Sequence, residues 1–120
     1  MELWNSRELC KAVNGKSLNN SYWQANSISI DTRSIKKSGV FFALKGNKVD
    51  GHKFINHAFK NGAVAVVANK KHKIEHENKN IIKVDDTYKA LETLGVNRRE
   101  VSLSKLIERI SSFLFDILNN

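Results

Sequence analysis

The 120-residue sequence predicts an α/β fold: a small three-layer α/β/α sandwich with a mostly parallel sheet, plus a C-terminal amphipathic helix. Two observations predict it. Short, apolar, β-branched runs alternate with amphipathic stretches, which is typical of a sheet covered by helices on both faces. The length suits one hydrophobic core, and 41% of the residues are hydrophobic, as is ordinary for a folded globular protein.

The first expected element is a helix over residues 6–14. Asn5 or Ser6 can cap its first turn, and Gly15 is expected to supply the left-handed residue that ends it. Cys10 is the single cysteine of the chain and lies within this helix. A buried thiol is therefore expected there rather than a nucleophile or a metal ligand.

Residues 16–26 are polar and predict a loop that Tyr22 and Trp23 anchor to the core. Strict alternation over residues 27–31 then predicts a half-buried strand with its two isoleucines facing inward. The continuous apolar run at residues 40–44 predicts a strand that is buried on both faces.

Asp50 can cap a helix over residues 51–61, which Asn61 and Gly62 would end. Its expected apolar stripe consists of Phe54, Ile55, Ala58 and Phe59. A buried strand is expected next over residues 63–68, and a lysine-rich connection then leads to a further strand over residues 81–85. The following helix starts at Asp86 or Thr87, with Gly95 as its C′ residue.

Residues 103–118 carry apolar side chains at spacings of three and four, which predicts an amphipathic helix. The helix either docks on the sheet or mediates self-association, and sequence alone leaves both readings open. No signal-peptide pattern and no apolar run of membrane-spanning length occurs in the sequence. We therefore expect a cytoplasmic protein with no membrane contact.

The formal charge of +8 is concentrated in one part of the chain. Residues 45–73 hold seven lysines against Asp50 alone, a surplus of six positive charges. A basic nucleic-acid-binding module is one interpretation. The sequence lacks the alternating aromatic and basic residues of an RNA-binding strand and any recognisable recognition helix, so nucleic acid is not the expected partner.

Motifs for common catalytic sites are absent from the sequence. Neither Gly-x-x-x-x-Gly-Lys-Ser/Thr nor Gly-x-Gly-x-x-Gly occurs, so no phosphate cradle for ATP is predicted. His52 and His57 are five residues apart, which misses same-face helical spacing. His72 and His76 have metal-ligand spacing, but they lie in a polar connection, so no metal site and no catalytic residue is predicted.

Two loops stand out because each follows a predicted strand and carries polar groups at its carboxyl end, where open α/β sheets bind ligands. In the first, Thr32 offers a hydroxyl, and Arg33 offers a fork that suits phosphate. In the second, Asn47 offers an amide and Lys48 a mobile charge. Asp31 and Asp50 are expected to bond their own turns, and Arg33 can pair with a nearby aspartate instead of a ligand.

Four segments together resemble the N-terminal domain of the Mur ligases of peptidoglycan synthesis. They are Ile30-Asp31-Thr32-Arg33, residues 40–47, residues 50–55 and residues 61–67. The resemblance covers residues 3–95. It is strongest to the D-alanyl-D-alanine-adding branch of the family, since the branch that adds the third stem-peptide residue commonly has serine where this chain has Thr32.

The resemblance implies a domain that holds the UDP end of UDP-MurNAc-peptide, which is then the expected partner. The residues that it implies for this substrate are Ile30, Thr32, Arg33, Asn47, Lys48 and Val49. The resemblance also implies ATP and Mg²⁺ for the full-length family, bound by a further domain. No cofactor is expected in this chain.

The sequence departs from the family after residue 95, where a strand and a Gly-Lys-Thr/Ser loop would follow. We expect residues 1–95 to form the binding domain and residues 96–120 a divergent helical tail, and we hypothesise that a frameshift or early stop produced it. The expected function is substrate binding without autonomous ligase activity. The alternative is an inert relic that self-associates through residues 103–118.

Overall fold

A five-stranded sheet with the order β2-β7-β6-β5-β4 forms the centre of the computed structural model, which describes residues 4–46, 49–73 and 79–98. The strands are β2 Lys16–Ser17, β4 Ser27–Ser29, β5 Gly39–Phe42, β6 Ala63–Asn69 and β7 Ile81–Val84. Strands β4 to β7 are mutually parallel, and β2 pairs antiparallel with β7 at the edge. The predicted mostly parallel sheet is therefore confirmed.

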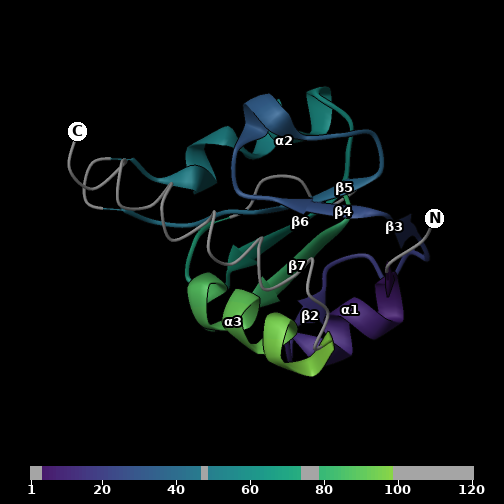
Figure 1. Cartoon of the computed structure of the whole chain (residues 1–120). Coiled ribbons are helices and arrows are strands. Elements are labelled where there is room, and N and C mark those ends of the chain that lie inside the picture. The colour runs from purple at the N-terminus through teal and green to yellow at the C-terminus, as the bar shows by residue number, and fades with distance from the viewer. Residues whose placement is uncertain (1–3, 47–48, 74–78, 99–120) are drawn as a thin grey trace.

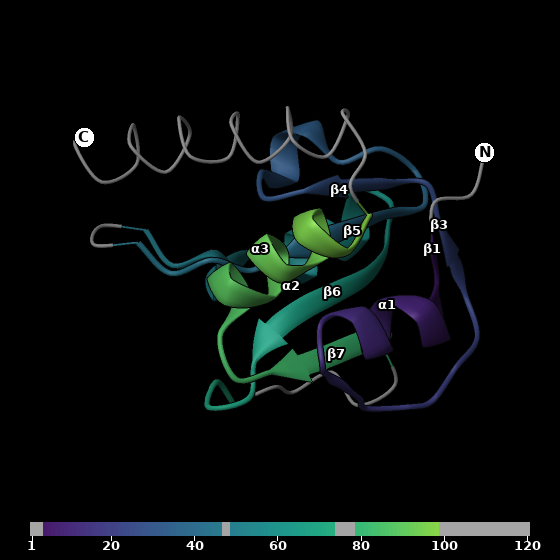
Figure 2. The same ribbon diagram turned by 60° about the horizontal axis from the view of Figure 1, so that its bottom comes forward.

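Helices cover both faces of this sheet, which confirms the three-layer α/β/α architecture (Figure 1). Helices α1 Ser6–Ala12 and α3 Thr87–Arg98 lie on one face. Helix α2 Ile55–Lys60 lies on the other face and follows directly from the 3₁₀ turn η2 Gly51–Phe54. Turned by 60°, Figure 2 shows α1 and α3 in front of the strands.

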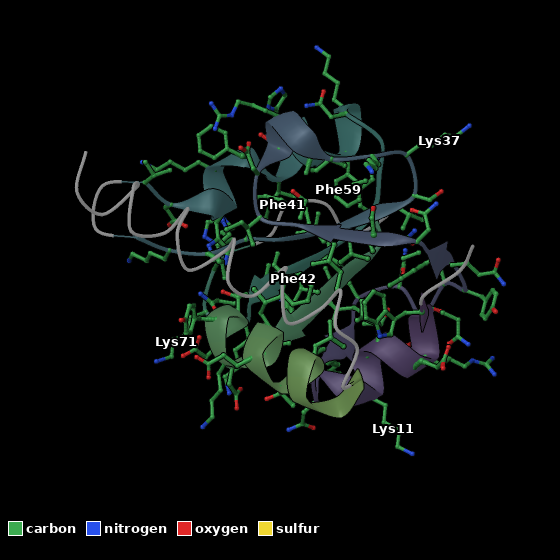
Figure 3. All side chains as sticks on the ribbon, viewed as in Figure 1. Lys11, Lys37, Phe41, Phe42, Phe59 and Lys71 are labelled. Atoms are coloured by element: carbon green, nitrogen blue, oxygen red, sulfur yellow. The ribbon has the colours of Figure 1, made fainter. Side chains whose placement is uncertain are left out.

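Phe41 and Phe42 divide the apolar core between the two faces of β5. Phe42 packs with the residues of α1 and α3, whereas Phe41 packs with those of α2. Figure 3 shows the two rings on opposite sides of the ribbon. Both rings are at most 1% exposed. Full burial of one such ring contributes about 2 kcal/mol or more, so both layers stabilise the sheet.

Helix α1 begins with a reciprocal capping box. Asn5 Oδ1 accepts from the backbone N–H of Glu8 at 2.9 Å, and Glu8 Oε1 accepts from the N–H of Asn5 at 3.1 Å. The left-handed residue after the helix is Asn14 with φ 53°, so the prediction for Gly15 was wrong. Gly15 is needed instead for close approach, because a Cβ there would lie 2.4 Å from Ile82 Cγ2.

Residues 16–26 are not simply a loop. They contain β2 and the short strand β3 Gln24–Ala25, which pairs antiparallel with β1 Trp4–Asn5. Trp23 is buried as predicted, whereas Tyr22 is 59% exposed and does not anchor the segment. Two-residue strands are too short to produce an alternating pattern, so the sequence does not reveal them.

The remaining helices are close to their predicted positions, with two corrections. Phe54 is 41% exposed rather than inward-facing, because it ends the 3₁₀ turn before α2 begins. Gly95 lies inside α3, which continues to Arg98, so it is not the C′ residue.

The expected helix at 103–118 lies outside the described residues. In the part of the chain that the structure describes, no helix is long and apolar enough to cross a bilayer.

Candidate functional site

The first predicted loop follows β4 and turns through the 3₁₀ segment η1 Thr32–Ser34. Asp31 caps this turn, since its Oδ1 accepts from the N–H of Arg33 at 2.9 Å. The guanidinium of Arg33 donates back to both carboxylate oxygens of Asp31, with Nη2 2.8 Å from Oδ2. These bonds hold the pKa of Asp31 below its ordinary 3.8. Arg33 therefore fixes its own loop, and its side chain remains 76% exposed.

Thr32 is only 8% exposed and is held from helix α2. Its Oγ1 lies 3.0 Å from Nδ1 of His57, and its carbonyl accepts from Nδ2 of Asn61 at 2.7 Å. Ile30, at the start of this loop, packs partly buried against the core. Sequence reasoning missed the roles of His57 and Asn61, because these contacts join residues 25 and 29 positions apart.

The second predicted loop leaves the sheet after β5 and returns to η2 as a narrow hairpin. Lys45 and Asp50 form an isolated antiparallel bridge, and the N–H of Gly46 donates to the carbonyl of Val49 at 2.8 Å. The N–H of Gly51 donates to the carbonyl of Leu44 at 2.7 Å. Val49 is 40% exposed. The other two predicted residues of this loop, at 47 and 48, lie outside the described residues.

Gly51 lies at the base of this hairpin, so close to the backbone of Leu44 that there is no room for a side chain. A Cβ at this position would lie 2.9 Å from both the nitrogen and the oxygen of Leu44. Asp50 precedes it and caps η2, because its Oδ1 accepts from the N–H of His52 at 3.0 Å. This confirms the prediction that Asp50 bonds its own turn.

His52 is a buried polar residue, and the sequence did not reveal its role. Its side chain is 2% exposed, and its Nδ1 lies 2.7 Å from Asp50 Oδ1. On the other side of the ring, Nε2 accepts from the backbone N–H of Asn69 at 2.9 Å. Burial raises the pKa of the Asp50 carboxyl, but the hydrogen bonds from His52 outweigh burial and leave this pKa below its ordinary 3.8.

Asp50, His52 and His72 bring three possible metal-ligand atoms within 4.8 Å of one another. The imidazole rings of His52 and His72 lie 4.7 Å apart, centroid to centroid. The hydrogen bonds of His52 argue against a metal centre. Nε2 needs its lone pair to accept from Asn69, so Nδ1 carries the proton and has no lone pair for a metal. The cluster is therefore a hydrogen-bonded structural unit.

Asn69 continues this unit to the next helix. Its side-chain Oδ1 accepts from the N–H of Thr87 at 2.9 Å, at the start of α3. Nearby, Lys70 Nζ lies 2.7 Å from Asp85 Oδ1 across the ends of β6 and β7. Polar contacts thus link the segments that follow β5, β6 and β7 at the carboxyl edge of the parallel sheet.

A separate cavity of about 560 Å³ lies between α1 and the segment after β2. None of the predicted site residues lines it. Its polar groups bond one another: Ser6 Oγ accepts from the N–H of Trp23, and Cys10 Sγ lies 2.9 Å from the carbonyl oxygen of Gly15. Cys10 is half-buried and its thiol is engaged, in line with a structural role. We assign no ligand to this cavity.

Comparison with known proteins decides the family. The sequence profile described as "Mur ligase family, catalytic domain" matches residues 24–108, well over half of the chain. The chain belongs to the Mur ligase family. The expectation drawn from its motifs is confirmed, and members of two branches of this family are among its relatives.

Three curated relatives illustrate both branches. The UDP-N-acetylmuramoyl-tripeptide–D-alanyl-D-alanine ligase of Rickettsia prowazekii is 36% identical over 88% of this chain and 22% of its own length. The same ligase of Bacillus subtilis is 34% identical over 74% of this chain and 20% of its own length. The UDP-N-acetylmuramoyl-L-alanyl-D-glutamate–2,6-diaminopimelate ligase of Rickettsia typhi is 44% identical over 58% of this chain and 14% of its own length.

Solved Mur ligase structures share the fold described above. MurF from Acinetobacter baumannii superposes with a TM-score of 0.71 at 28% identity, over 80% of this chain and 21% of that protein. MurF from Thermotoga maritima, solved in complex with ADP, gives a TM-score of 0.51 at 30% identity, over 59% of this chain and 16% of that protein. This Mur ligase chain therefore spans about a fifth of the length of the MurF-type relatives it matches.

Proposed function

We propose that this Mur ligase chain binds the UDP end of a UDP-N-acetylmuramoyl-peptide, as part of a D-alanyl-D-alanine-adding ligase. One observation carries the proposal: the two loops with the predicted ligand residues follow the neighbouring parallel strands β4 and β5 at the carboxyl edge of the sheet. Ligands of open α/β sheets bind outside this edge. The 36% identity to the Rickettsia prowazekii ligase over 88% of the chain supports the choice of branch.

In the proposed complex, the first loop presents a rigid surface. Asp31 and Arg33 neutralise each other, and His57 and Asn61 hold Thr32, so this loop needs little reordering on binding. A loop held in its bound shape loses less conformational entropy when the ligand arrives, which favours affinity.

The second loop supplies the charge. Lys48 is proposed to meet the diphosphate, Asn47 to pair with a polar edge of the ligand, and exposed Val49 to contact its apolar part. Ile30 is proposed to contact the ligand from the first loop. Residues 45–73 carry a surplus of six positive charges, of which Lys70 is paired with Asp85, and the remaining surplus would favour the approach of an anionic substrate.

ATP and Mg²⁺ chemistry does not fit the residues of this chain. The 120 residues contain no Gly-Lys-Thr/Ser loop. In the cluster of Asp50, His52 and His72, the imidazole ring of His52 has no free lone pair to bind a cation. We therefore derive no phosphoryl-transfer step, and we expect these 120 residues to bind substrate without forming an amide bond on their own. The binding domain is proposed to comprise residues 1–95, with residues 96–120 as a helical tail.

Isothermal titration calorimetry with UDP-N-acetylmuramoyl-tripeptide tests the proposal. We expect saturable heat, and we expect Lys48→Ala and Thr32→Ala to weaken binding about tenfold each. Lys37→Ala is the matched control and should leave affinity unchanged. Lys37 precedes β5, whereas Lys71 follows the carboxyl end of β6, and Figure 3 shows the two lysines on opposite sides of the molecule. Absence of heat for the wild-type chain at about 1 mM ligand would refute the proposal.

The diaminopimelate-adding branch is a second candidate within the family, because a Rickettsia typhi member is 44% identical over 58% of the chain. The same calorimeter separates the two. The D-alanyl-D-alanine-adding branch predicts tighter binding of the UDP-linked tripeptide, and the other branch predicts tighter binding of the UDP-linked dipeptide. Equal affinities would indicate that the chain recognises only the nucleotide end.

A further inference from the structure

We propose that His52 is a positioning residue that holds the base of the second loop, the hairpin formed by residues 44–46 and 49–51, in the shape that binds ligand. This inference rests on the proposed function, because it concerns the same loop. The side chain of His52 is 2% exposed and lies between the hairpin base and β6, so it does not contact the ligand itself. It acts on the ligand through Asp50.

The ring of His52 makes two hydrogen bonds. Nδ1–H donates to Asp50 Oδ1 at 2.7 Å, and Nε2 accepts from the N–H of Asn69 at 2.9 Å. Asp50 belongs to the hairpin, whereas Asn69 is the last residue of β6. His52 therefore ties a loop to the central strand of the sheet through one rigid, neutral ring.

The base of the hairpin has one other tie to β6, because the N–H of Ala43 donates to the carbonyl of Val67 at 2.9 Å. Among its described residues, the hairpin's own bonds are the Lys45–Asp50 bridge and the two backbone bonds at Gly46 and Gly51. An isolated two-stranded hairpin is only marginally stable in water. The tie through His52 adds to the one at Ala43 and therefore raises the fraction of molecules in which the base of the hairpin keeps this shape.

Asp50 receives two bonds from the same residue, one from the backbone N–H and one from the ring of His52. The carboxylate is thus fixed in orientation, and the residue before it, exposed Val49, is fixed with it. If loss of the ring bond leaves about a tenth of the molecules with a competent hairpin, the apparent affinity falls about tenfold.

Isosteric substitutions test this role. Glutamine places an oxygen near Nε2, so His52→Gln keeps the acceptor for Asn69 and loses the donor to Asp50. Asp50→Asn keeps an oxygen that accepts both bonds from His52 and removes the negative charge. We expect His52→Gln to weaken UDP binding about tenfold and Asp50→Asn to change it less than about twofold.

The opposite pattern, with Asp50→Asn weakening binding and His52→Gln leaving it intact, would overturn the proposal, because charge and not geometry would then matter. His72→Gln is the matched control. It removes the ring beside His52 but neither of the two bonds, and UDP affinity should be retained. Addition of Zn²⁺ to the ligand-free wild-type chain should leave its melting temperature unchanged, since both ring nitrogens of His52 are engaged in hydrogen bonds.

Amide hydrogen exchange, measured by NMR without ligand, keeps the two proposals distinguishable. We expect His52→Gln to accelerate exchange at the N–H groups of Gly46 and Gly51 by at least about fivefold, with the amides of β6 unaffected. Unchanged exchange at both glycines would refute the positioning role even if UDP binds. Failure of the wild-type chain to bind UDP, with accelerated exchange in the variant, would refute only the proposed function.

Discussion

Asn61 at the end of α2 donates from Nδ2 to the backbone carbonyl of Thr32 at 2.7 Å, and so joins residues 29 positions apart. The bond gives the first loop a partner on a helix rather than on its own strand. Together with the His57–Thr32 contact, it makes α2 the support of the first loop of the proposed site.

Removal of this support should weaken both the fold and the loop. Asn61→Ala is expected to lower the free energy of unfolding by about 1 kcal/mol, the usual contribution of one such hydrogen bond. Asn56→Ala, at an exposed position of the same helix, is the control and should change stability by less than about 0.5 kcal/mol. Urea denaturation measures both, and equal losses would contradict the role of Asn61.

Gly15 should tolerate no side chain. In Gly15→Ala, the new Cβ would lie 2.4 Å from Ile82 Cγ2 and must push strand β7 or helix α1 aside. Overpacking of this kind costs about 1–3 kcal/mol. Asn14→Gly is the matched change at the neighbouring left-handed position, where glycine is at least as well accommodated. Thermal unfolding of the pair should show a lower melting temperature for Gly15→Ala alone.

The Asp31–Arg33 pair predicts a dependence of stability on pH. The pKa of Asp31 in the folded protein lies below its ordinary 3.8, so the carboxylate form of Asp31 stabilises the fold. This contribution is fully present above the unfolded pKa and is lost as the pH falls through the folded pKa. Arg33→Gln should therefore lose less stability than the wild type as the pH falls below about 4. The effect is small because Arg33 is exposed, and identical melting curves of the two proteins at every pH would contradict it.

Phe41 and Phe42 are adjacent in sequence, but each should contribute separately to the stability of the fold. Each is buried in a different layer, so Phe41→Ala leaves a cavity beneath α2 and Phe42→Ala one beneath α1 and α3. Each substitution is expected to cost about 3–5 kcal/mol. Phe54→Ala is the control, because that ring is 41% exposed. A Phe42→Ala protein as stable as Phe54→Ala would show that the α1–α3 layer does not depend on this ring.

The sequence predicted the sheet and its layers well for a physical reason. A parallel strand that is buried on both faces, such as residues 63–68, is a continuous apolar run that few other structures require. The short pairs at β1–β3 and β2–β7 were missed, because two residues carry no periodicity and the pairing joins distant segments. Gly95 was misplaced since a glycine within a helix and one at its end look alike in sequence.

The candidate site was predictable only in part. The positions of Asp31, Thr32 and Asp50 after strands follow from the chain, because local turns need short polar side chains there. The two histidines at 52 and 57 did not stand out, since spacing on one helix was the only criterion that sequence offered. In the structure the first lies in a 3₁₀ turn and the second in α2, and each contacts a different loop.

The ten residues from Gly51 to Lys60 therefore hold both loops of the proposed site at once, one through His52 and the other through His57. Because one short segment contacts both loops, we expect a displacement of this segment to move both loops together. Ala58, in the middle of this segment, is fully buried against the sheet, so its small side chain allows the segment to pack closely. A larger residue at that core position would widen the site without touching any residue that meets the ligand.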